Sequence, residues 1–221
     1  MFQGDHILSD LEDDKTGISR THILPESVAL GNTGRVWLDT IIQKMQKTGY
    51  LHNHERMWLA AYLVHFGKLH WRRLADWSYY HFLDGDLGVN HLSWQWVSST
   101  FSSKPYYFTS DNIEKYARVA APELIGSYED VWARITDPAR VSPFADEASV
   151  SLEATSLLAY PRLESLSGQE VVVLTPWSLS ESLVRDIKPE NRYLVLDEGF
   201  FARHPMSPAR IEWIVGYARQ L

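Results

Sequence analysis

Two stretches of the sequence decide the fold: residues 50–57, YLHNHERM, and residues 84–96, DGDLGVNHLSWQW. In the second stretch Asp86, Asn90 and Trp94 are four residues apart. A helix that begins after Asp86 therefore places a carboxylate, an amide and an indole on one face. The spacing predicts a helix with a polar site along it.

The first stretch predicts a second helix, with Asn53 as its N-cap and Arg56 on the same face as Asn53. If the two helical faces meet, Arg56 neutralises Asp84 or Asp86, because a buried carboxylate needs a partner. In that case Asp84→Ala would cost about 3–5 kcal/mol. The resulting pocket suits a planar heterocycle with imide edges and a phosphate tail. In the alternative interpretation Asp84-Gly85-Asp86 is only a turn and cap, and the Trp residues are only core.

Helical periodicity continues on both sides of these stretches, and apolar runs near the C-terminus read as strands. Short connections between the helices favour an antiparallel helical assembly. Ser207 followed by Pro208 is a good start for a last helix. The helices are predicted at residues 35–49, 53–67, 71–83, 87–99, 111–120 and 128–135, and the strands at residues 171–174 and 193–196.

The predicted fold class is mainly α, with a small α/β appendage at the C-terminus. We expect a loosely ordered N-terminal arm (1–33), a helical region (34–137), a linker (138–168) and an α/β tail (169–221). Two strands and two helices are too few to be stable alone, so this tail is expected to dock on the helical region or on a partner.

Composition narrows the function classes. The 21 basic and 28 acidic residues give a net charge of −7, which opposes non-specific binding to phosphate backbones and anionic membranes. The chain has no Cys, which excludes disulfides and thiolate chemistry. His52 and His54 cannot share a helix face, so no metal site is expected. With no secretory signal and no membrane-spanning run, the sequence predicts a cytoplasmic protein.

At these residues the chain resembles the FAD-binding domain of the DNA photolyase/cryptochrome family, over about residues 37–108. Several uncommon residue types of that family occur here at separate positions, and the spacing between them also matches the family. The matching motifs are Asn53-x-x-Arg56-Met57, the pair Trp71-Arg72, and DGD-x-x-x-N-x-x-x-WQW-x-x-ST at residues 84–100.

The resemblance implies FAD as cofactor and a role for each matching polar residue. Asn53 and Arg56 would border the flavin pocket, with Arg56 paired to Asp84. Asp84 and Asp86 would hold the imide edge of the ring and the ribityl or ribose hydroxyls. Asn90 would face the flavin N5.

The resemblance also implies an electron-transfer path and a substrate site. Trp94 would be the indole nearest the flavin, and Trp71 the next in the path. Met57 and Trp96 match positions that pack on a flipped pyrimidine lesion, so damaged DNA is the expected substrate. The chemistry would belong to the cofactor, and the protein would contribute geometry and electrostatics.

This sequence also departs from the family pattern. The antenna domain and the phosphate-binding helical segment that precede the flavin domain in the family are not recognised here, so a second polypeptide that completes the fold is a possible partner. No third Trp of the path is identified, and His54 stands where the family has an arginine. Residues 171–201 look weakly like the opening strands of the antenna domain; a small packing appendage is the alternative.

Three functions are therefore open. The first is a photolyase-like enzyme that transfers an electron to a pyrimidine lesion under light, together with a partner. The second is a short cryptochrome-like flavoprotein that senses light or redox state without repair. The third is a helical scaffold without a cofactor.

Overall fold

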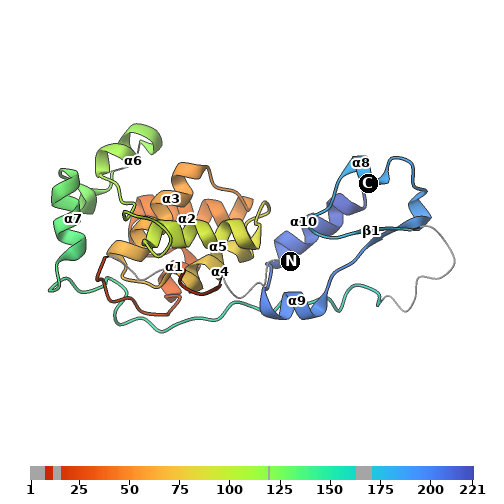
Figure 1. The fold of residues 1–221 in the computed structure, drawn as a ribbon, viewed down its shortest axis with the longest axis horizontal. Helices are drawn as coiled ribbons and strands as arrows, with labels where there is room; N and C mark the ends of the chain where they lie inside the picture. Colours follow the sequence, from red (N-terminus) through yellow and green to blue (C-terminus); the bar gives the residue numbers. More distant parts are fainter. Residues whose placement is uncertain (1–7, 12–15, 119, 163–170) are drawn as a thin grey trace. The chain divides into compact units, whose positions relative to one another are not determined.

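The computed structural model describes residues 8–11, 16–118, 120–162 and 171–221, and it confirms the predicted fold class, mainly helical with a small α/β part (Figure 1). The chain divides into two compact units, Met1–Ser151 and Leu152–Leu221. The division falls inside residues 138–168, the expected linker, and the other expected boundaries stay predictions.

Unit 1 is helical over its described residues. The stretch at residues 50–57 leads into α3, and the stretch at residues 84–96 leads into α5. Helix α4 packs against α5. The segment Tyr62–Phe66 continues α3 as one turn of π-helix and is fully buried. The elements are α1 (Glu26–Leu30), α2 (Val36–Thr48), α3 (Asn53–Ala61), the π-helix η2 (Tyr62–Phe66), α4 (Trp71–His81), α5 (Leu87–Ser98), α6 (Ser110–Ala117), the 3-10 turn η3 (Pro122–Leu124) and α7 (Tyr128–Thr136).

The helix ends follow local rules, with one correction. Gly49 ends α2 in the left-handed conformation, as the sequence predicts. Asn53, however, is not the N-cap of α3. His52 is the cap: its ring accepts from the backbone N–H of His54, and Glu55 accepts from the backbone N–H of His52. This reciprocal capping box satisfies two end groups, which moves the cap one residue upstream of the prediction.

The expected N-terminal arm contributes to the core of unit 1 in its described part. Leu24 and Val28 are buried; Val28 lies within α1, which ends at Gly31. The carboxylate of Glu147 accepts from the backbone N–H of Ser27 at 2.9 Å and from its hydroxyl at 2.7 Å. Ser27 and Glu147 are 120 residues apart in the sequence, so these two bonds fix α1 to the segment that follows α7.

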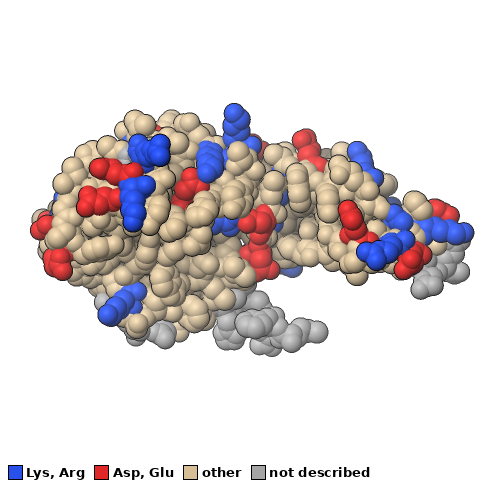
Figure 2. Space-filling view, turned by 90° about the horizontal axis from the view of Figure 1, so that it is seen from above, with Lys and Arg blue, Asp and Glu red and all other residues tan. Residues whose placement is uncertain are grey.

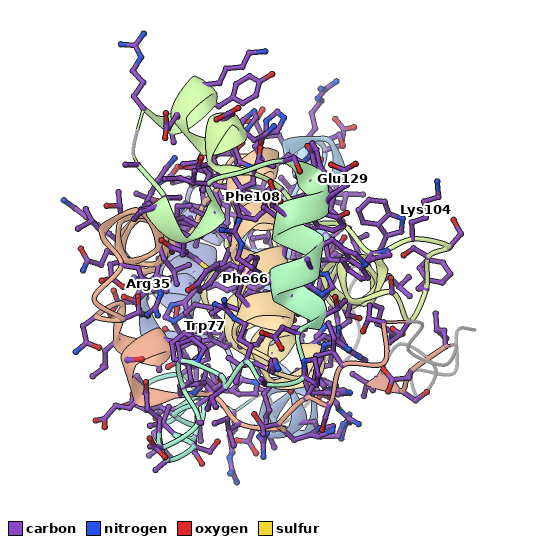
Figure 3. All side chains as sticks on the ribbon, turned by 90° about the vertical axis from the view of Figure 1, so that its left-hand side faces the viewer. Arg35, Phe66, Trp77, Lys104, Phe108 and Glu129 are labelled. Carbon is purple, nitrogen blue, oxygen red and sulfur yellow. The ribbon has the colours of Figure 1, made fainter. Side chains whose placement is uncertain are left out.

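The core of unit 1 is rich in aromatic side chains, which accounts for the many Trp and Tyr residues. Phe66 and Phe108 lie in the interior in Figure 3, and Lys104 projects away from it. Trp37 packs edge-on against Tyr62, with 5.1 Å between ring centroids. Aromatic pairs of this geometry contribute about 0.5–1.5 kcal/mol beyond their buried area.

One histidine is enclosed in this core. His65, on η2, is completely buried, and its Nε2 lies 3.0 Å from the carbonyl oxygen of Val97. Burial, and secondarily the charge of Arg20, lower its pKa to about 3. Burial likewise lowers the pKa of His81 to about 4. Both rings are therefore neutral in the folded chain at mildly acidic pH.

We expect the free energy of unfolding to fall between pH 7 and pH 5. Below about pH 6.5 the unfolded chain binds a proton at His65 that the folded chain does not bind, so acid favours unfolding. For His65 alone this linkage amounts to about 2 kcal/mol over that interval. Urea unfolding of the wild type and of His65→Gln at both pH values measures it. Equal pH dependence in the two proteins would contradict the assignment.

Unit 2 holds a two-stranded parallel sheet of β1 (Val172–Leu174) and β2 (Arg192–Leu194), in the register Val172 to Arg192. Both strands lie where the apolar runs predict them. The hydroxyl of Ser207 caps the last helix by accepting from the backbone N–H of Arg210, as expected. The helical elements of this unit are α8 (Glu181–Val184), the 3-10 turn η4 (Pro189–Asn191), α9 (Glu198–Arg203) and α10 (Pro208–Ala218).

Candidate functional site: a cavity between α3 and α5

The two predicted helical faces meet around a cavity of about 590 Å³. This volume is in the range of small-molecule and cofactor sites. All of the predicted site residues line it except Trp71. The lining consists of Asn53, Arg56, Met57, Leu59, Ala60, Ser78, Phe82, Asp84, Gly85, Asp86, Val89, Asn90, Leu92, Ser93, Trp94, Trp96, Val97 and Phe101.

Arg56 and Asp84 form the predicted ion pair at this cavity. The Nη2 atom of Arg56 lies 2.7 and 2.9 Å from the two carboxylate oxygens of Asp84. Its Nε donates to the carbonyl of Leu51 at 2.9 Å, and the guanidinium lies over the ring of Phe82, 4.0 Å from the centroid. Three different contacts thus fix the position of one side chain.

The ion pair is not buried, because the side chains of Arg56 and Asp84 are 29% and 51% exposed. The expectation of a 3–5 kcal/mol loss applied to a buried pair. Water screens the exposed pair, and we expect Asp84→Ala to change the free energy of unfolding by about 1 kcal/mol or less. The acidic side chain is then available to a ligand at the mouth of the cavity.

If Asp84 holds a ligand, its removal should weaken ligand binding more than it lowers the free energy of unfolding. We expect Asp84→Ala to weaken FAD binding by about tenfold, since a hydrogen bond to a charged group is worth about 1.5–3 kcal/mol. Equilibrium dialysis with FAD measures the binding, and urea unfolding measures the stability. Asp146→Ala, which removes an exposed acid outside the cavity, is the control. Equal FAD affinity in the two variants would argue against a role of Asp84.

Asp86 and Asn90 are both at the cavity, and each also has a structural task. One oxygen of Asp86 accepts from the backbone N–H of Val89 at 2.8 Å and so caps α5. The amide nitrogen of Asn90 donates to the carbonyl of Ala75 at 2.8 Å, and its oxygen lies 3.1 Å from the hydroxyl of Ser78. The side chain of Asn90 is therefore oriented by α4.

Ser78 is a site residue that sequence reasoning missed. Its buried hydroxyl accepts from the indole N–H of Trp94 at 2.9 Å and lies against Asn90. The hydroxyl thereby links the indole and the amide that line the same cavity. The available indication was the pair of small residues, Ala75 and Ser78, three apart on a helix rich in aromatic residues.

The two tryptophans of the predicted electron path are placed differently. Trp94 is 5% exposed and lines the cavity. Trp71 is 1% exposed and does not line it. The ring of Trp71 contacts His91 of α5 edge-on, with 6.1 Å between centroids.

The mouth of the cavity carries aromatic side chains. Trp96 is 41% exposed, and its ring centroid is 5.8 Å from that of Tyr106. Phe101, 46% exposed, lines the cavity together with Met57 and was not predicted. Large exposed apolar side chains around a cavity are typical of a surface that receives a ligand.

The lining fits the ring-bearing part of FAD. The inner wall is apolar, with Leu59, Ala60 and Val97 buried, and suits a planar ring system. Carboxylate, amide and guanidinium groups follow toward solvent, where hydroxyls and imide edges need partners. Arg56 is the single cation among the described lining residues, so a counterpart for the diphosphate is not part of this cavity.

The helical fold and this cavity define a flavin-binding domain. The family described as the FAD binding domain of DNA photolyase matches residues 18–145. The chain belongs to this family, FAD is its cofactor, and the protein is a photolyase/cryptochrome-like flavoprotein.

Individual relatives match a shorter part. The chain is 34% identical to the mitochondrial deoxyribodipyrimidine photo-lyase of Saccharomyces cerevisiae over 100 residues, 45% of this chain and 18% of the relative. It is 35% identical to the deoxyribodipyrimidine photo-lyase of Escherichia coli over 78 residues, 35% of this chain and 16% of the relative. The chain thus spans less than a fifth of these relatives. Unit 2 lies outside residues 18–145, which match the family.

Proposed function

We propose that the cavity between α3 and α5 binds FAD and that the chain supplies electrons to it under light. Asn53, Arg56, Asp84, Asp86 and Asn90 hold the cofactor. The observation that supports this proposal is that residues far apart in the sequence, on α3, α5 and the turn between α4 and α5, line one cavity. When bound, FAD supplies the light absorption and the redox chemistry.

The chain's own residues orient and enclose the cofactor. Arg56 is held by Asp84, Leu51 and Phe82 and keeps its charge at one place on the wall. For the second amide N–H of Asn90 the described residues provide no acceptor, so it is available to a ligand. Buried Val97 and Leu59 exclude water from the inner wall.

The proposed electron donors are Trp94, at the cavity, and Trp71, behind it. The N–H of Trp94 is held by Ser78, which keeps the indole in one rotamer. Without this N–H contact the indole could turn to another orientation, and electron transfer to a flavin in the cavity would be slower. Trp94→Phe keeps an aromatic ring there and removes the proposed donor.

The visible spectrum of the purified chain, before and after blue light with a thiol reductant, tests this function. We expect flavin bands in the wild type, in Trp94→Phe and in the control, and bleaching of the oxidised flavin in the wild type and the control but not in Trp94→Phe. Trp213→Phe, which changes an exposed indole of unit 2, is the control. Flavin bands that bleach equally in all three proteins would overturn the electron path, and a wild type without flavin bands would overturn the binding site.

We further propose that the cavity mouth receives a flipped pyrimidine lesion of DNA, with Met57 and Trp96 packing on it. Stacking on exposed Trp96 would replace contacts that the base loses on extrusion. Loss of cyclobutane dimers from irradiated oligonucleotides under blue light tests this step. Trp96→Ala should lose this activity and keep its flavin spectrum. A second polypeptide, considered from the sequence, is not part of the proposal.

The competing function is light or redox sensing without repair, and the charge of the chain favours it. The net charge is −7. On the face seen in Figure 2, basic and acidic side chains alternate and neutral residues separate them. Such a face does not attract a phosphate backbone strongly. Flavin bleaching without any loss of dimers would favour sensing over repair.

Over the described residues, none of the helices is both long and apolar enough to cross a bilayer.

A further inference from the structure

The two proposed electron donors have chemically different partners on their indole nitrogens. The N–H of Trp94 donates to the hydroxyl of Ser78 at 2.9 Å. The N–H of Trp71 donates to a carboxylate oxygen of Asp10 at 2.5 Å. A hydroxyl is a poor proton acceptor, whereas a carboxylate is a base.

The contact of Asp10 with Trp71 is held by the surrounding structure. Gln95, completely buried on α5, accepts from the backbone N–H of Leu11 at 3.1 Å and donates to the carbonyl of Ser9 at 2.9 Å. These two bonds flank Asp10 and fix its backbone over α4. The side chain of Gln95 thus presents the carboxylate to the indole.

A histidine supports the second oxygen of the same carboxylate. The Nε2 atom of His70 lies 3.4 Å from Asp10 Oδ2, while its Nδ1 accepts from the backbone N–H of Arg72 and caps α4. The ring therefore donates toward Asp10 from Nε2 in its neutral form. Burial, and next the stacked ring of His22, lower the pKa of His70, which keeps it neutral. A neutral His70 ring offers Asp10 a hydrogen bond and leaves the first carboxylate oxygen on the indole N–H.

We propose that Asp10 is the base that takes the indole proton of Trp71 when Trp71 is oxidised. This inference rests on the proposed electron path. FAD, when bound, would supply the oxidant under light. Trp94 loses one electron, and Trp71 then reduces oxidised Trp94 by one electron. The N–H bond of Trp71 breaks and an O–H bond forms on Asp10, which leaves a neutral indole radical and a carboxylic acid.

The geometry gives this step a direction. The side chain of Asp10 is 46% exposed, so its new proton passes to water, while Trp71 itself is 1% exposed. Oxidised Trp94 keeps its indole proton, which stays hydrogen-bonded to the hydroxyl of Ser78, and is readily reduced again. Loss of the proton at Trp71 prevents the electron from simply returning. Asp10 would thereby retain the charge separation at the second tryptophan, with no third Trp identified in the sequence.

The contact itself is tested without flavin. In ¹⁵N-Trp spectra of the flavin-free chain, Trp71→Phe assigns the indole resonance. We expect Asp10→Ala to shift the indole proton of Trp71 upfield, and Asp10→Asn, which keeps an oxygen acceptor, to shift it less. An unchanged resonance in Asp10→Ala would overturn the inference.

The proton transfer is tested by flash spectroscopy of the FAD-loaded chain. We expect Asp10→Asn to slow deprotonation of the tryptophan radical by about a hundredfold, the low end of general-base catalysis, and the wild type to show a deuterium isotope effect. Asp146→Asn is the control, because this exposed carboxylate does not line the cavity and, among the described residues, has no hydrogen bond to an indole. Deprotonation at the wild-type rate in Asp10→Asn would overturn the role of Asp10 alone. A wild type that forms no tryptophan radical would overturn the electron path and the inference together.

Discussion

Replacing Ser93 with Trp is expected to weaken FAD binding strongly while the chain stays folded. Ser93 is an exposed residue of α5 that lines the cavity. Among the described residues its hydroxyl bonds only to the carbonyl of Val89 on its own helix, at 2.7 Å. An indole at this position would occupy the space that the flavin ring needs. Overpacking costs about 1–3 kcal/mol, so FAD affinity should fall by about tenfold to a hundredfold.

The measurements are the flavin content of the purified chain and FAD binding by calorimetry, with circular dichroism as the test of folding. Thr40→Trp is the matched control, since Thr40 is an exposed residue of α2 that does not line the cavity. It should bind FAD like the wild type. If Ser93→Trp retained its flavin, the cofactor would have to bind elsewhere on the chain.

Replacing Gly67 with Ala is expected to have the largest effect on stability. A Cβ atom there would lie 2.4 Å from the carbonyl oxygen of Leu63 and 3.0 Å from the ring of Phe144. The oxygen belongs to η2 and already accepts from the backbone N–H of Leu69 at 3.1 Å, so it cannot move without disrupting the buried turn. We expect a loss of about 3 kcal/mol or more in the free energy of unfolding.

Thermal and urea unfolding measure this loss, and Gly88→Ala is the control within unit 1. The added Cβ atom at Gly88 would meet only Asp86, at 3.4 Å, an ordinary contact. Helix propensity then favours Ala by up to about 1 kcal/mol. The two Gly→Ala changes should therefore act in opposite directions. A small effect of Gly67→Ala would show that η2 relaxes at little cost.

The sequence alone was sufficient to predict much of the lining of the cavity between α3 and α5. The four-residue spacing of Asp86, Asn90 and Trp94 is a local property of a helix, and so is the position of Arg56 after Asn53. Such spacings determine which side chains share a face before any tertiary contact exists. The resemblance to the photolyase family rested on these residues, and the match over residues 18–145 confirms it.

Two other features did not follow from the spacing of residues. The cap of α3 at His52 depends on a balance between neighbouring polar groups that propensity does not resolve. The exposure of the pair of Arg56 and Asp84 depends on how the turn after α4 is covered. Neither could be obtained from spacing alone.

The sequence by itself therefore determined the helices and their polar faces, because these depend on residues within about two helical turns of one another. It also determined the family, because uncommon residue types recur at fixed separations along residues 53–100. Only the tertiary structure brought Asp10 to Trp71 and Ser78 to Trp94. A hydrogen bond between distant segments requires the whole fold to bring donor and acceptor within about 3 Å, and no local pattern encodes that distance.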